Sequence, residues 1–125
     1  LGFDRTKTKN IGGVFMAKLV VLILSNPQER RKVVTGLKFA KMAGEGGELE
    51  DVKLIVSGEA VGIFRDTSFK DIIEEVKIAV PVMVCKMNAD AAGVAGEVES
   101  CGVLLAPVGK ELINLIKQGY EVISF

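Results

Sequence analysis

The sequence predicts an α/β fold built on one mostly parallel sheet, and short aliphatic segments are the first evidence for it. Residues 19–24, 79–85 and 103–108 are apolar runs, the pattern of strands that are covered on both faces. Segments with helical periodicity and helix caps alternate with these runs, which favours parallel strands joined by helices. A chain of 125 residues suits one domain. We therefore expect a three-layer α/β/α domain with a five-stranded sheet.

The first strand and the first helix follow each other closely. Residues 18–24 form the first strand, and Asn26 is a good N-cap for the helix after it. Pro27 fits the first helical position and Glu29 completes a capping box. The helix is expected to continue to about residue 43, where a cluster of glycines ends it.

The middle of the chain repeats this alternation. We expect a second strand at 52–57, a compact stretch with about one helical turn at 58–64, and a helix at 69–77 capped by Thr67 or Ser68. The third strand is expected at 80–85.

The last third of the chain contains two more strands. A short helix at 88–92 ends at Gly93, and residues 96–100 connect it to a fourth strand at 102–105. The final helix begins at Pro107 and presents an inner face formed by Leu112, Ile113 and Ile116. A fifth strand follows at 120–124.

Short, right-handed connections favour the strand order 2-1-3-4-5. In that order a crevice opens at the carboxyl ends of strands one and three. Asn26 and Pro27 follow strand one, and Cys85 ends strand three. We therefore expect the functional site at this edge, with further lining residues from the chain after strands two and three: Ser57, Gly58, Glu59, Lys86, Met87 and Asn88.

Residues 1–15 form a separate segment in this interpretation, and residues 16–125 form the domain. The segment mixes polar and basic residues and ends near Gly12 and Gly13. We expect it to be an extension of the domain, either natural or left from cloning, or an arm that packs on a neighbouring subunit.

Cys85 is the strongest candidate for chemistry. The thiolate is the reactive form of cysteine, and a helix N-terminus or a neighbouring cation lowers the thiol pKa. The turn at Asn88 and the ammonium of Lys86 are candidates for these two influences, so we expect an accessible Cys85 with a depressed pKa. The alternative is that Cys85 fills space in the core, as free cysteines often do.

Cys101 has two interpretations. It lies near the expected start of the fourth strand, which is at the opposite end of a parallel sheet from the end of the third. A buried core thiol is the interpretation this favours, and a thiol that resolves an adduct on Cys85 is the alternative.

The remaining composition excludes several function classes. The sequence has no histidine, which removes Cys-His and Ser-His catalysis and the commonest metal ligand, so we expect no metal and no cofactor. It contains neither a CxxC pair nor a glycine-rich phosphate-binding motif. With 16 basic and 16 acidic residues, nothing favours binding to nucleic acid or to a membrane surface. Two cysteines without a secretory signal favour a reducing cytoplasm.

From about residue 18 to residue 125 the sequence resembles the DsrE/DsrF-like family of small sulfur-relay proteins. The resemblance rests on ordered segments: the opening aliphatic strand, Val-Ser-Gly-Glu-Ala-Val at 56–61, Val-Pro-Val-Met-Val-Cys at 80–85, Gly-Val at 93–94 and Gly-Tyr-Glu-Val-Ile at 119–123.

This resemblance implies a cytoplasmic sulfur carrier or sulfurtransferase that holds sulfur on Cys85 as a persulfide. It also implies donor and acceptor proteins as partners, and a homo-oligomer such as a trimer or a hexamer. The alternative function is a non-catalytic or regulatory oligomeric module that binds a small nucleotide-like ligand, with Cys85 as a packing residue.

Overall fold

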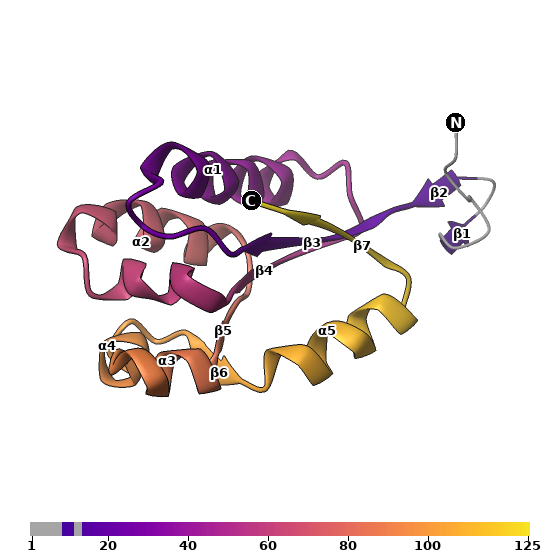
Figure 1. Ribbon diagram of the computed structural model, residues 1–125. Helices are drawn as coiled ribbons and strands as arrows, with labels where there is room; N and C mark the ends of the chain where they lie inside the picture. The colour runs from indigo at the N-terminus through magenta and orange to yellow at the C-terminus, as the bar shows by residue number, and fades with distance from the viewer. Residues whose placement is uncertain (1–8, 12–13) are drawn as a thin grey trace.

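The computed structural model describes residues 9–11 and 14–125, with side chains from residue 17 onward. Strands and helices alternate along the chain (Figure 1). Their bounds are β1 Lys9–Ile11, β2 Val14–Met16, β3 Lys18–Ile23, α1 Arg30–Gly46, β4 Asp51–Val56, η2 Gly58–Phe64, η3 Thr67–Phe69, α2 Lys70–Ala79, β5 Val82–Cys85, α3 Lys86–Ala92, α4 Ala95–Ser100, β6 Leu104–Ala106, α5 Val108–Lys117 and β7 Tyr120–Ser124.

The main sheet has five parallel strands in the order β6-β5-β4-β3-β7. The expected class, a five-stranded parallel sheet between layers of helices, is confirmed. The strand order is a correction: β4 lies between β3 and β5, whereas the order 2-1-3-4-5 places β3 beside β5. Right-handed connections are compatible with both orders, so handedness could not choose between them.

Burial explains the observed order. Neighbouring residues Leu54 and Ile55 of β4 point to opposite faces of the sheet, and they are 1% and 0% exposed. A strand covered on both faces belongs in the centre of the sheet. β7 lies at an edge, and its residues from Glu121 to Ser124 are exposed.

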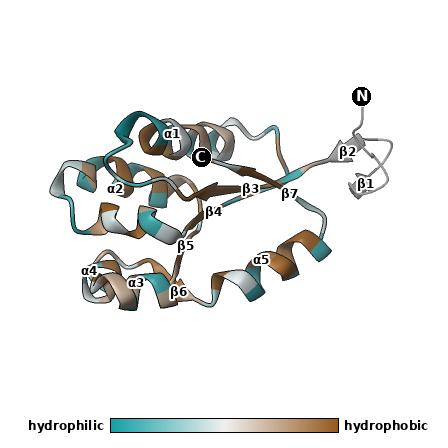
Figure 2. Cartoon of the chain, viewed as in Figure 1, coloured by the Kyte–Doolittle hydropathy of each residue, from teal (hydrophilic) through white to brown (hydrophobic). Residues whose placement is uncertain are grey.

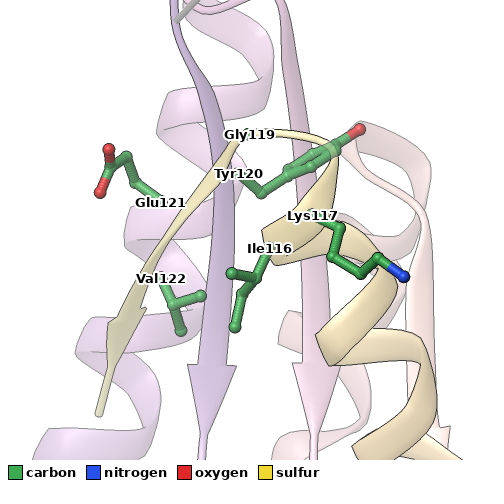
Figure 3. A pocket seen from close by; sticks show the side chains of 6 residues that line it. All are labelled: Ile116, Lys117, Gly119, Tyr120, Glu121 and Val122. Carbon is green, nitrogen blue, oxygen red and sulfur yellow. The ribbon is translucent and has the colours of Figure 1, made fainter. Parts of the chain in front are cut away.

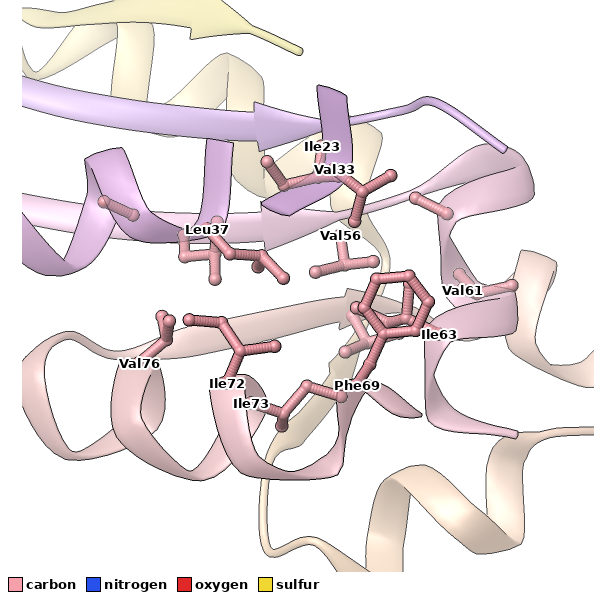
Figure 4. Packing of buried hydrophobic residues seen from close by; sticks show 14 of the residues in the cluster. Ile23, Val33, Leu37, Val56, Val61, Ile63, Phe69, Ile72, Ile73 and Val76 are labelled. Carbon is pink, nitrogen blue, oxygen red and sulfur yellow. The ribbon is translucent and has the colours of Figure 1, made fainter. Parts of the chain in front are cut away.

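The helices divide unequally between the two faces. α1 and α2 cover one face over a large cluster that also includes residues from η2, α3 and α4. Figure 4 shows Val33 and Leu37 of α1, Ile73 and Val76 of α2, and Phe69 within one cluster beside the strands. The opposite face carries a smaller cluster under α5: Val20, Ile55, Val108, Leu115 and Tyr120. In Figure 2 the strands of the main sheet are largely brown, and α5 also carries brown segments.

Several helices differ from expectation in their bounds or their orientation, including α3, which begins at Lys86 rather than at residue 88. α1 begins at Arg30, because Asn26 accepts a hydrogen bond from the backbone N–H of Gln28 (2.8 Å) and forms a local turn. Residues 96–100, expected as a connector, belong to α4. On α5, Leu115 faces the sheet, whereas Ile113 and Ile116 are 60% and 53% exposed. The expected inner face of α5 was therefore wrong for Ile113 and Ile116, which point away from the sheet.

Near the N-terminus, β1 pairs with β2 in a separate antiparallel sheet. The expected boundary between residues 15 and 16 therefore falls inside β2. Residues 1–8 and 12–13 of the expected extension lie outside the described residues. Among the described residues, no helix is long and apolar enough to cross a membrane.

Gly36 allows α1 to approach the sheet closely. A Cβ atom at this position would lie 2.4 Å from Cδ1 of Ile23 and 2.8 Å from Cγ of Phe125. The Cβ of any larger residue would therefore force α1 away from β3 and from the end of β7.

Gly36→Ala is expected to lower the free energy of unfolding by about 1–3 kcal/mol, because overpacking outweighs the better helix propensity of alanine. Gly46→Ala at the end of the same helix is the control. Its Cβ would meet only Glu48 Oε1, at 3.9 Å, and a gain of up to about 1 kcal/mol is expected. Urea denaturation measures both changes, and stabilisation by Gly36→Ala would contradict this packing.

Candidate functional site

Cys85 is the last residue of β5 and the N-cap residue of α3. The register of the sheet places it opposite Ala106 of β6. Cys85 is half-buried and packs against the smaller hydrophobic cluster under α5. The strand therefore holds the thiol at the carboxyl edge of the sheet, on the face that α5 covers.

The neighbour of Cys85 on its other side is the end of β4. Val56 pairs with Val84 at the last register position of β4 with β5, so Ser57 and Cys85 are the next residues along the two chains. Because β4 separates β3 from β5, Ser57 takes the place that the expected strand order gave to Asn26.

A hydrogen-bond network joins the residues after β4 to α3. The Asn88 carboxamide oxygen accepts from the hydroxyl of Ser57 (3.1 Å) and from the backbone N–H of Gly58 (2.9 Å). Gly58 has a φ of +59°, a conformation that glycine adopts readily. Asn88 is half-buried, so these bonds are partly shielded from water.

The expected residues after β3 reach the same edge of the sheet, but β4 lies between β3 and β5. The Asn26 amide donates to a carboxylate oxygen of Glu59 (2.7 Å). Pro27 lies against η2, where a Cβ on Gly62 would be 3.1 Å from the Pro27 ring. The structure therefore joins these residues to the β4 end rather than to Cys85.

Lys86 and Met87 are exposed at the start of α3. The ammonium of Lys86 bonds to Asp90 one turn later (2.7 Å). The hydrogen bond and the charge of Asp90 raise the pKa of Lys86. This cation is thus engaged along the outer side of α3. Met87 is 78% exposed and presents an apolar side chain two residues from Cys85.

Arg65 holds the far end of α3. Its guanidinium donates to the carbonyl oxygens of Ala92 (2.6 Å) and Gly93 (3.1 Å). A cation at a helix C-terminus interacts favourably with the exposed carbonyls. The sequence does not predict this contact, because Arg65 and Ala92 are distant in sequence and no local motif relates them.

Cys101 lies on the opposite face of the sheet from Cys85. It caps α4 and lines a hollow of about 320 Å³ that also includes Phe64, Ile73 and Glu97. Its carbonyl oxygen accepts from the ammonium of Lys77 on α2 (2.6 Å). Cys101 therefore ends a helix rather than beginning a strand, and the sheet separates its thiol from Cys85.

A second hollow, of about 470 Å³, lies between the end of α5 and β7. Figure 3 shows Ile116 and Val122 side by side, while Glu121 points to the other side of β7 and Lys117 points away. Because the charged groups do not converge, this hollow offers an apolar surface rather than a reactive centre.

Polar residues at the amino end of the sheet hold β7 against its neighbours. The Tyr120 hydroxyl donates to Asp51, and the ammonium groups of Lys18 and Lys53 lie 4.9 and 5.9 Å from the centre of the Tyr120 ring. Burial raises the pKa of Asp51, but the hydrogen bond from Tyr120 and the charge of Lys53 outweigh it, so that this pKa is lowered. The cluster lies at the opposite end of the sheet from Cys85.

Tyr120→Phe is expected to lower the free energy of unfolding by about 1 kcal/mol near neutral pH, because it removes the hydrogen bond to Asp51. The expected loss is small because solvent weakens the interactions of the partly exposed Asp51 carboxylate. A carboxyl group whose pKa is lower in the folded state than in the unfolded state stabilises the fold when the pH is above the unfolded-state pKa. This stabilisation is lost as the pH falls through the folded-state pKa. The difference between variant and parent should therefore shrink below about pH 4. Denaturation across this pH range measures it, and a constant difference would contradict the role of Asp51.

Comparisons with known proteins place these features in a family. Residues 17–125 match the family model described as the DsrE/DsrF-like family. A search of curated protein sequences found no match.

Three solved structures share the fold. The conserved protein of unknown function BT1422 from Bacteroides thetaiotaomicron is 20% identical with a TM-score of 0.75, covering 86% of this chain and 94% of its own. The ychN protein from E. coli is 18% identical with a TM-score of 0.69, covering 88% and 100%. Protein MTH1491 from Methanobacterium thermoautotrophicum, also of unknown function, is 17% identical with a TM-score of 0.70, covering 87% and 99%.

Proposed function

The chain belongs to the DsrE/DsrF-like family, and from this premise we propose that it is an intracellular sulfur carrier that holds sulfur on Cys85 as a persulfide. The observation that carries the proposal is the position of Cys85: a half-buried thiol where β5 ends and α3 begins. Persulfide chemistry needs a thiolate and access for a second sulfur compound. It needs no metal and no histidine base.

The loading reaction balances with thiosulfate as the donor. The Cys85 thiolate attacks the outer, sulfane sulfur, the bond between the two sulfur atoms of thiosulfate breaks, and sulfite leaves with the electron pair of that bond. Cys85 then carries a deprotonated persulfide. A thiolate of an acceptor protein attacks the terminal sulfur and regenerates the Cys85 thiolate, so no external oxidant or reductant is consumed.

The surroundings of Cys85 support this use of the residue. The side chain is neither fully buried nor fully exposed, which gives a donor access while apolar neighbours limit hydration. Exposed Met87 and Leu24 lie near the same edge and offer apolar contact area for an acceptor protein. We propose that donor and acceptor proteins approach this edge.

Treatment with a sulfane-sulfur donor such as thiosulfate or polysulfide should add about 32 Da to the intact protein, the mass of one sulfur atom. Cys85→Ser should abolish the added mass, whereas Cys101→Ser, the matched control, should leave it in place. Mass spectrometry without reductant measures both variants.

An adduct that survives Cys85→Ser would contradict the proposal. A Cys85 thiol that resists alkylation until the protein unfolds would favour the alternative, in which the domain binds a small ligand and Cys85 packs the core.

We also propose that copies of the chain associate through the α5 surface, defined here by Ile113, Ile116 and Val122. These three side chains are 60%, 53% and 39% exposed. α5 is the helix that covers this face of the sheet, whereas α1 and α2 together cover the other. A contiguous exposed apolar surface favours an interface. The assembly that we propose is a homo-oligomer, a trimer or a hexamer.

Ile116→Glu is expected to shift the protein toward smaller species, because the interface would bury an unpaired charge. Met42→Glu on α1 is the control, since Met42 is also exposed (62%) but lies on the opposite side of the sheet. Analytical ultracentrifugation at micromolar concentration measures both. A parent protein that sediments only as a monomer would contradict the proposed assembly.

A further inference from the structure

We infer that Asn88 is a positioning residue for Cys85, and that its lack of charge is part of this role. The inference rests on the proposed function of Cys85 as a reactive thiol. In this role Asn88 holds the start of α3 against the chain that follows β4. Because its amide is neutral, it does so without placing a second negative charge beside a thiolate or a persulfide anion.

Asn88 connects two segments that are distant in sequence. Its carboxamide oxygen accepts two hydrogen bonds from residues 30 and 31 positions earlier, Gly58 and Ser57. A backbone N–H can only donate, so the group that faces Gly58 must be an acceptor. Asn88 therefore joins the first turn of α3 to the chain that leaves β4.

This connection lies next to the Cys85 thiol in the chain. Cys85 directly precedes α3, and Ser57 directly follows Val56, whose pairing partner Val84 directly precedes Cys85. The carboxamide thus closes a ring that contains Cys85, the first turn of α3, Asn88 and Ser57. Release of the carboxamide would free both the Ser57 side chain and the start of α3.

The side chain at position 88 is an amide, which is neutral, rather than a carboxylate. An aspartate at position 88 could accept the same two hydrogen bonds. It would, however, add a negative charge three residues after Cys85, at an edge that already holds the carboxylate of Glu59. A nearby like charge disfavours ionisation of a thiol and repels an anionic donor such as thiosulfate. Neutrality is therefore what asparagine contributes beyond its hydrogen bonds.

The test compares Asn88→Asp and Asn88→Ala, both in a Cys101→Ser background so that alkylation reports Cys85 alone. The rate of alkylation by iodoacetamide is measured from about pH 6 to about pH 10, a range that spans the ordinary thiol pKa. Asn114→Asp on α5 is the matched control, because it adds the same charge at a residue outside the Cys85 ring. Circular dichroism reports the melting temperature of each variant.

Asn88→Asp should retain a melting temperature close to that of the parent. At about pH 7 it should react about three- to eightfold more slowly, which is the order of magnitude expected for one added negative charge near a thiol in a largely hydrated setting. The rates should converge at high pH, where the thiol is ionised in both proteins. Asn88→Ala should melt at a lower temperature than the parent, but its alkylation rate should not shift to higher pH. Asn114→Asp should match the parent in both measurements.

Two results would overturn the inference. One is an Asn88→Asp profile that coincides with those of the parent and Asn114→Asp, which would show that charge at position 88 does not reach the thiol. The other is an Asn88→Asp protein as unstable as Asn88→Ala, which would show that an acceptor oxygen alone does not make the connection. Alkylation does not depend on sulfur uptake, so the two proposals can fail separately. If the protein takes up no sulfur but Asn88→Asp still shifts the pH profile of alkylation, the role of Asn88 is supported and the proposed function is contradicted.

Discussion

The pairing of β4 with β5 is the constraint on which the candidate site depends. β4 is buried on both faces, so it occupies the centre of the sheet and determines which chain end lies next to Cys85. The register of Val56 with Val84 brings the residues that follow them, Ser57 and Cys85, to the same edge of the sheet. Asn88 can then bond to Ser57 and Gly58, because the start of α3 lies beside the end of β4.

The same sheet separates two kinds of surface. The face under α1 and α2 is well covered and contains the larger hydrophobic cluster. The face under α5 contains the smaller cluster and leaves Ile113, Ile116 and Val122 exposed. Cys85 belongs to the second face and Cys101 to the first. Sulfur held on Cys85 would therefore lie on the face where we propose that copies of this chain associate, at the edge that donor and acceptor proteins approach, and away from the second thiol.

The sequence predicted the class of the fold and the position of Cys85 at a strand end, because aliphatic runs and helix caps are local signals. It did not predict the strand order, since the two orders differ only in contacts between residues distant in sequence, such as Val56 with Val84. The rotation of α5 was wrong for a related reason. Leu112, Ile113 and Ile116 are all apolar, and only the fold determines which of them face the sheet and which form a surface.

For the candidate site, the sequence predicted the residues better than their arrangement. Ser57, Gly58, Glu59 and Asn88 lie at one edge, as expected, but Asn26 reaches that edge through Glu59. The expected influence of Lys86 on the thiol did not take account of Asp90, which binds the ammonium one turn later. The double acceptor role of Asn88 could not be predicted, because its two donors are 30 and 31 residues away.

The central claim is that Cys85 carries a transferable sulfur atom, and release of that sulfur as thiocyanate tests it most directly. The protein is treated with a sulfane-sulfur donor, freed of the excess and exposed to cyanide, which attacks the terminal sulfur of a persulfide. The account predicts about one thiocyanate per chain, together with return of the protein to its original mass. An absence of thiocyanate from the fully folded protein, or an equal yield from a chain without the Cys85 thiol, would contradict the account.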